Sequence, residues 1–307
     1  MASASSKLPR GLLCPLVTPL KTGDILDVAA LDRLVRFVGA GADGLVLGDL
    51  FCGEGLELSG DTRAQMVEAT LEFSEGRWPV FVTITSDTEE ETVALFEQIK
   101  LSVEGSSYSD QLVWVDYPIY YHGNRGLPQF YEVLSRDTAV PFTLANDRRL
   151  VEGRKSNIKH KNIRTSVLKK LAGMDCIQGL IFTGSLKRAM NYQKAVRHSS
   201  GFKFYDGNEA AFIRQPSSDG VLAAGSNLLP QAWQNITRSC LNQFDVERQY
   251  ADHLSHMWET GVMVKAFYDL YGGQPVLQSQ NHSLFFSHLF FPVGIDQESQ
   301  CCSISTC

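Results

Sequence analysis

The 307-residue sequence lacks the features that would place it outside the soluble globular class. None of its seven cysteines form a Cys-x-x-Cys pair, and no apolar run near either end is long enough to cross a bilayer. The net charge of -6 supplies no overall basic field to attract nucleic acid or an anionic lipid surface. We therefore expect no nucleic-acid partner and no membrane partner.

Signals for secretion, metals and nucleotides are also missing. The opening stretch MASASSKLPRG has no apolar core, so we expect a cytoplasmic protein; its serines, basic residues and lack of acids leave an organelle transit segment as the alternative. His253 and His256 are three residues apart without an acidic pattern around them, and LVTPLKTGD after the first apolar segment is not a glycine-rich phosphate turn. The sequence predicts no metal and no cofactor.

One basic cluster stands out against the acidic balance. Its members are Arg148, Arg149, Arg154, Lys155, Lys159, His160, Lys161, Arg164, Lys169 and Lys170. A solvated loop and helix face is the simpler interpretation, and a patch for anions or nucleic acid is the alternative.

Eight short apolar segments, each ending in small or turn residues, set the fold class. They are residues 12–19, 44–49, 80–85, 112–118, 141–146, 177–184, 202–207 and 220–226. Amphipathic helical patterns separate most of them, which indicates a parallel sheet buried on both faces. This pattern predicts an α/β fold, a (β/α)8 TIM barrel, with an open doubly wound sheet as the alternative.

The boundaries follow from the same pattern. Residues 1–226 are expected to form the barrel, 227–277 a helical C-terminal cap, and 278–307 a tail that has no clean period. Asp27, Ser59 and either Asp87 or Thr88 are expected to begin helices, because short polar side chains favour the N-cap position.

Seven stretches together resemble one family. They are GLLCPLVTPLKTGDILDVAAL (11–31), GADGLVLGDLFCGEGLELS (41–59), VDYPIYYHG (115–123), PFTLAND (141–147), FYDGNEAAFI (204–213), DGVLAAGSNLLPQAW (219–233) and VMVKAFYDLYGG (262–273). In order and spacing they are similar to the dihydrodipicolinate synthase and N-acetylneuraminate lyase family. The resemblance covers residues 11 to 277.

The resemblance implies class I aldolase chemistry. In the family, a lysine at the end of the sixth strand forms a Schiff base with a 2-oxo acid, usually pyruvate, and a tyrosine of the fifth strand moves the proton. Threonines in the loop after the second strand and a tyrosine of the Pro-Tyr-Tyr turn complete the relay, and that loop also holds the substrate carboxylate. The family also forms dimers and tetramers, so we expect a homo-oligomer of one of these sizes.

This sequence departs from the family at its catalytic positions. The lysine position falls on Ile181 or Phe182, and the fifth-strand tyrosine position on Ala145. The two threonine positions fall on Phe51 and Cys52. From the relay, only Tyr120 or Tyr121 survives, and Tyr120 is the remaining catalytic candidate. The candidate ligand-binding residues are Phe51, Cys52, Gly53, Asn146, Thr183 and Gly207.

Other groups could supply chemistry in place of the lost ones. A displaced amine would have to come from Lys187, Lys203 or Lys265, each of which also reads as an ordinary solvated lysine. Cys52 reads as a packing thiol more readily than as a nucleophile, because no histidine is near it in sequence. Five acids near strand ends are candidates to line the barrel mouth: Asp49, Glu54, Asp116, Asp206 and Glu209. For Glu54 and Asp206, a structural role as hydrogen-bond acceptors for loop amides is the alternative.

The sequence therefore predicts a lyase-family barrel without Schiff-base aldolase activity that retains binding of a small 2-oxo acid. One alternative is an active lyase that uses a displaced lysine. The other is a non-catalytic subunit or scaffold that assembles with an active homologue.

Overall fold

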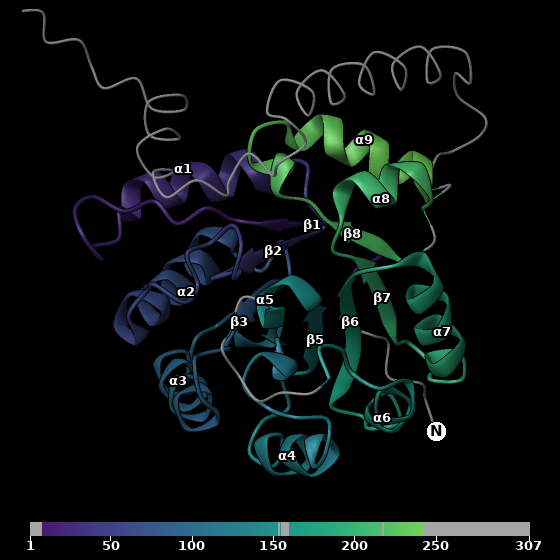
Figure 1. Ribbon diagram of the computed structural model, residues 1–307. Coiled ribbons are helices and arrows are strands. Elements are labelled where there is room, and N and C mark those ends of the chain that lie inside the picture. The colour runs from purple at the N-terminus through teal and green to yellow at the C-terminus, as the bar shows by residue number, and fades with distance from the viewer. Residues whose placement is uncertain (1–7, 153, 155–159, 217, 242, 244–307) are drawn as a thin grey trace, which may run out of the picture.

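Eight parallel strands close into a barrel in the order in which they occur in the chain (Figure 1). The computed structural model describes residues 8–152, 154, 160–216, 218–241 and 243. Pairing of β1 with β8 completes the ring. The strands are β1 Gly11–Pro15, β2 Gly44–Leu47, β3 Val80–Thr83, β4 Leu112–Asp116, β5 Phe142–Asp147, β6 Ile177–Thr183, β7 Lys203–Asp206 and β8 Gly220–Leu222. The predicted (β/α)8 barrel is confirmed.

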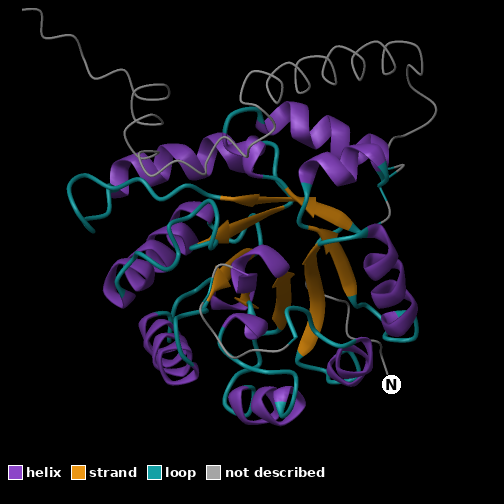
Figure 2. Cartoon of the chain, viewed as in Figure 1, coloured by secondary structure: helices purple, strands orange, loops and turns teal. Residues whose placement is uncertain are grey.

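Most helices surround the strands on the outside of the barrel, whereas α5 (Arg148–Glu152) lies over its centre in the view of Figure 1 and Figure 2. The helices are α1 Val28–Gly39, α2 Gly60–Ser74, α3 Glu89–Ser102, α4 Leu127–Leu134, α5 Arg148–Glu152, α6 Thr165–Leu171, α7 Leu186–Val196, α8 Glu209–Arg214 and α9 Pro230–Cys240. Short 3-10 turns lie at Ser109–Gln111, Pro118–Tyr120 and Ala224–Asn227.

Three helix starts follow the predicted capping chemistry. The side chains of Asp27, Ser59 and Thr88 each accept a hydrogen bond from the backbone N–H three residues ahead. Each bond satisfies one of the N–H groups that a helix leaves without an internal partner. The predictions for these starts are confirmed, and Thr88 rather than Asp87 caps α3.

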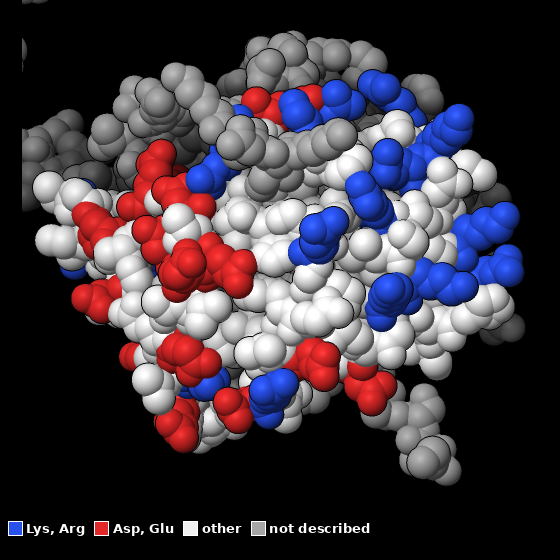
Figure 3. Space-filling model, turned by 60° about the horizontal axis from the view of Figure 1, so that its bottom comes forward, with Lys and Arg blue, Asp and Glu red and all other residues white. Residues whose placement is uncertain are grey.

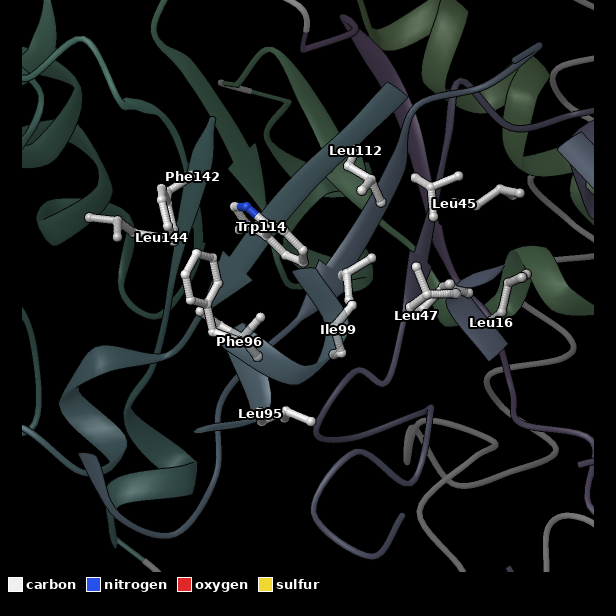
Figure 4. Packing of buried hydrophobic residues seen from close by; sticks show 14 of the residues in the cluster. Leu16, Leu45, Leu47, Leu95, Phe96, Ile99, Leu112, Trp114, Phe142 and Leu144 are labelled. Carbon is white, nitrogen blue, oxygen red and sulfur yellow. The ribbon is translucent and has the colours of Figure 1, made fainter. Parts of the chain in front are cut away.

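Two separate apolar layers hold the barrel together. The outer layer lies between strands and helices, where Phe96 of α3 packs edge-on against Trp114 of β4 at a centroid distance of 5.1 Å (Figure 4). The inner layer fills the barrel and includes Phe81, Ile181 and Tyr205. Because successive strand residues point to opposite faces, each strand position belongs to one layer or the other.

The range predicted for the cap, 227–277, includes α9 in the described part of the chain. The rest of that cap, the tail at 278–307 and Lys265 lie outside the described residues. Within the described part, no helix has the length and apolar character needed to span a membrane.

Candidate functional site

The pairing of β5 with β6 defines the place where an imine-forming amine would have to stand. Ala145 pairs with Ile181, and both belong to the inner layer of the barrel. Phe182 belongs to the outer layer, where its ring packs edge-on against Tyr192 at 5.0 Å. Of the two alternatives for the lysine position, only Ile181 therefore faces the barrel interior, and Ala145 lies directly beside it.

No lysine among the described residues is buried. Lys187 is exposed on α7. Lys203 is the first residue of β7, at the end of the barrel opposite the carboxyl ends of the strands. The described lysines therefore bring no amine to the neighbourhood of Ala145 and Ile181.

A buried carboxylate organises the loop after β2. Asp49 is 2% exposed and accepts three hydrogen bonds from its own chain. Tyr117 Oη donates to Oδ1 at 2.7 Å, and the backbone N–H groups of Phe51 and Cys52 donate to Oδ2 at 2.9 and 3.1 Å. Burial raises the pKa of Asp49, while these three donors oppose that rise. The loop amides are thus already occupied by an internal carboxylate.

Phe51 lies under a cation that is itself paired. The Arg149 guanidinium stands 4.6 Å from the centre of the Phe51 ring. Its Nε and Nη2 atoms donate to both carboxylate oxygens of Asp147, which is 4% exposed. The hydrogen bond to Asp147 raises the pKa of Arg149. This cation is held by a carboxylate and a ring in a geometry typical of arginine.

Cys52, Gly53 and Glu54 form hydrogen bonds with β1 and with the loop that follows β1. The Cys52 thiol donates to the carbonyl of Pro15 at 3.0 Å, and burial raises its pKa well above the ordinary value. Thr18 Oγ1 donates to the carbonyl of Gly53 at 2.9 Å, and the Thr18 N–H donates to Glu54 at 3.2 Å. A protonated thiol with a backbone partner is a packing group and not an activated nucleophile.

The remaining candidate ligand-binding residues also have partners within the chain. Asn146 Oδ1 accepts from the Ile163 N–H at 2.8 Å, on the outer side of β5. A Cβ atom at Gly207 would lie 2.3 Å from Thr183 Oγ1, so a larger residue at 207 would have to displace the Thr183 side chain. These residues hold loops together around the barrel mouth.

The two tyrosines of the 118–121 turn separate in space. Tyr120 packs with the inner layer, and its hydroxyl donates to Asp87 at 3.1 Å beneath the Arg154 guanidinium. Tyr121 instead donates to Asp116 at 2.7 Å. Tyr120 is thus the one of the pair that reaches the inner layer.

Asp116 lies on the outer side of β4, away from the mouth. Its carboxylate accepts hydrogen bonds from Thr85, Tyr121 and Tyr131 of α4. The expectation that Asp116 lines the mouth is therefore wrong, because the alternation that turns Val115 inward turns its neighbour outward.

Tyr117 lies at the barrel mouth beside Asp49, although it is not among the residues that the sequence predicts for the site. It follows Val113 and Val115 at a spacing of two, and all three belong to the inner layer. That spacing of two is the signal in the sequence that places Tyr117 on the inner face, whereas the family turn matches only Tyr120 and Tyr121. The Tyr117–Asp49 pair joins residues 68 positions apart.

Burial raises the pKa of two further acids, which lie near the carboxyl end of β7. Asp206 accepts from the Asn208 N–H at 2.8 Å, and burial raises its pKa to about 6. Glu209 accepts from the Gly225 N–H at 2.9 Å, and burial raises its pKa to about 7. Burial likewise raises the pKa of Glu54 to about 7. Among the described residues, no group of three His, Cys, Asp or Glu is arranged to hold a metal ion.

Comparisons with known proteins point in one direction. The sequence pattern of the dihydrodipicolinate synthetase family matches residues 8–262. The 4-hydroxy-tetrahydrodipicolinate synthase of Thermotoga neapolitana is 30% identical over 236 residues, which is 74% of each chain. That of Thiobacillus denitrificans is 27% identical over 241 residues, covering 77% of this chain and 75% of its own.

Solved structures show the same barrel. Dihydrodipicolinate synthase from Aquifex aeolicus superposes with a TM-score of 0.70 at 19% identity, covering 91% of this chain and 87% of that one. The chloride-inhibited enzyme from Acinetobacter baumannii, complexed with pyruvate, gives 0.69 at 18% identity, covering 92% and 88%. At such identities the likeness concerns the fold.

Proposed function

The chain belongs to the dihydrodipicolinate synthetase family, and from that premise we propose that it is a member without Schiff-base activity. The observation that carries the proposal is the β5–β6 register, which sets Ala145 beside Ile181 inside the barrel. An imine forms only when a deprotonated amine attacks the substrate carbonyl, and neither side chain has an amine.

The positions that carry protons in the family have also lost their proton-carrying side chains. A positioned proton carrier contributes about two to four orders of magnitude in rate. The side chain of Ala145 has no group that can donate or accept a proton. Phe51 has an apolar ring where the family loop has the hydroxyl of a threonine. Loss of the nucleophile and the relay together leaves little covalent catalysis, because residues that act as a unit fail together.

Asp49 adds a second reason against a 2-oxo acid substrate at neutral pH. The family resemblance assigns the loop after β2 to the substrate carboxylate, yet here the Phe51 and Cys52 amides donate to Asp49. Two carboxylates about 4 Å apart repel by about 4 kcal/mol at an effective dielectric constant near 20. We propose that any remaining binding of a small 2-oxo acid is weak while Asp49 is ionised.

Oligomeric state and location rest on the family resemblance and on the opening stretch of the sequence, respectively. The homo-oligomer of two or four chains and the cytoplasmic location remain predictions. A role as a non-catalytic subunit beside an active homologue is compatible with this barrel, and no described contact favours it over a separate scaffold.

The test is reductive trapping. The full chain is incubated with pyruvate and borohydride, and its intact mass is measured. We expect no mass shift and no lyase turnover. A stoichiometric adduct that maps to Lys187, Lys203 or any other lysine would replace this proposal with that of an active lyase with a displaced amine.

A variant pair sharpens the same experiment. Ile181→Lys places an amine inside the barrel, and Ile181→Met is the matched apolar control. We expect an adduct only in Ile181→Lys, without turnover, because Ala145 and Phe51 still lack proton carriers. Circular dichroism verifies that both variants fold. Full turnover in Ile181→Lys would contradict the proposed loss of the relay.

A further inference from the structure

A groove of about 730 Å³ lies outside the barrel, between α4 and α6, which pack side by side (Figure 1). Arg125 from the loop before α4, Arg164 immediately before α6, and Lys170 within α6 contribute cations to its lining. The described lining contains no Asp or Glu. We propose that this groove binds a small molecule that carries phosphate groups.

The ion pairs of the described residues distinguish Arg164 and Lys170 from other members of the basic cluster, and Arg125, outside that cluster, resembles these two. Several cluster members are already paired: Arg148 and Lys161 with Glu152, Arg149 with Asp147, and Arg154 with Asp87. Arg125, Arg164 and Lys170 form no ion pair with a described acid. Their charge is therefore available to a ligand.

The surface charge is divided in the same way. Figure 3 shows Lys and Arg side chains gathered over the side of the molecule on which α6 and α7 lie, and most Asp and Glu side chains over the opposite side and along the lower edge. A local field of one sign raises the concentration of an oppositely charged ligand near the groove even though the whole chain carries a net charge of -6.

A buried amide holds the two walls of the groove together. Asn124 is 7% exposed; its Oδ1 accepts from the Arg164 N–H at 2.6 Å, and its Nδ2 donates to the Asn162 carbonyl at 3.0 Å. These bonds tie the loop before α4 to the loop before α6. The cations from the two loops are thus presented together, which lowers the ordering cost of binding.

Polar neighbours of the cations suit an anion as well. Arg164 also donates to His160 Nε2, so these two lining side chains contact each other. The lining includes Gly126 and Gln129, at the start of α4, whose N-cap is Gly126 with a φ of 85° and no side-chain cap. The positive end of this helix adds to the cationic side chains.

Phosphate matches this lining better than other anions. Guanidinium groups bind phosphate oxygens in pairs, and the groove presents two of them with an ammonium group. Its volume lies within the roughly 300–1,000 Å³ of small-molecule sites. The acidic balance of the chain opposes a long polyanion such as nucleic acid.

The test is calorimetric titration of the full chain with pyrophosphate at low ionic strength. We expect saturable one-to-one binding, weaker binding of inorganic phosphate, no binding of acetate, and loss of affinity as salt is added, because exposed charges are screened. The double variant Arg125→Gln/Lys170→Gln should weaken pyrophosphate binding by about tenfold. Both side chains are exposed, so the variant should fold.

The matched control is Lys187→Gln/Lys194→Gln, which removes the same charge from exposed positions on α7 outside the groove lining. We expect its affinity to stay within about twofold of the parent. Equal weakening by both double variants would mean a diffuse field rather than a site, and would overturn the proposal. So would an absence of saturable binding, or a single-stranded oligonucleotide that binds and is not displaced by pyrophosphate.

Discussion

The barrel mouth and the groove between α4 and α6 differ in whether their charged side chains are paired with other groups of the chain. At the mouth, the Asp49 carboxylate is buried and held by three donors of the chain, and Arg149 is held by Asp147. In the groove, Arg125 and Lys170 are exposed and have no acidic partner among the described residues. The charge that the chain has not already neutralised is the charge that a ligand can use.

The difference has a physical cause. A buried charge costs several kcal/mol unless hydrogen bonds and counter-charges replace water, so the mouth has to satisfy its carboxylates internally. An exposed cation is hydrated and needs no partner. The charged groups at the mouth are therefore paired within the chain, whereas the cations of the groove remain open to the proposed ligand.

The largest loss of stability is expected when the Asp49 carboxylate at the barrel mouth is removed. Asp49→Ala removes the acceptor of Tyr117, Phe51 and Cys52 and leaves buried donors without partners. We expect the free energy of unfolding, measured by urea denaturation, to fall by about 2–4 kcal/mol.

Asp49→Asn, which keeps an acceptor oxygen, should lose less stability than Asp49→Ala. Glu104→Ala removes an exposed acid on the loop after α3 and serves as the control, with a change within about 0.5 kcal/mol. An Asp49→Ala protein as stable as the parent would contradict the role given to this carboxylate.

A change of pH is expected to have an intermediate effect on the free energy of unfolding. Burial raises the pKa of Glu209 to about 7 from its ordinary value of 4.5, so the folded state holds this proton more tightly than the unfolded state. Stability from this group is present below about pH 4.5 and is lost as pH rises to about 7 and above. Glu54 acts in the same direction.

The loss should be on the order of 1 kcal/mol for Glu209, after allowance for solvent screening of a partly exposed residue. Urea denaturation at pH 5 and pH 8 measures it, and Glu209→Gln should reduce the difference between the two values. If Glu209→Gln leaves the pH dependence unchanged, this residue does not titrate as proposed.

The smallest effect is expected from the groove. Arg125→Gln/Lys170→Gln should change the free energy of unfolding by less than about 0.5 kcal/mol, because neither side chain is paired with a described acid. The same urea measurement provides the check. A loss comparable to that of Asp49→Ala would mean that these cations support the fold, and the contrast between the two regions would disappear.

Much of this protein was accessible from local patterns in the sequence. The spacing of apolar segments predicts the closed barrel, and the side chains of Asp27, Ser59 and Thr88 mark helix starts, because these signals depend on residues a few positions apart. The absence of a lysine at both 181 and 182 is likewise visible in the sequence alone.

Tertiary structure decided what depends on distant partners. Strand pairing placed Ala145 of β5 beside Ile181 of β6 in the inner layer, although the two residues are far apart in the sequence. Closure of the barrel brought Tyr117 to Asp49 across 68 positions. Packing of α4 against α6 brought Arg164 and Lys170 of the basic cluster together with Arg125, which lies outside that cluster. The periodicity of the sequence predicts the face of a strand on which a residue lies. Which distant residues it contacts is determined only when the whole chain folds.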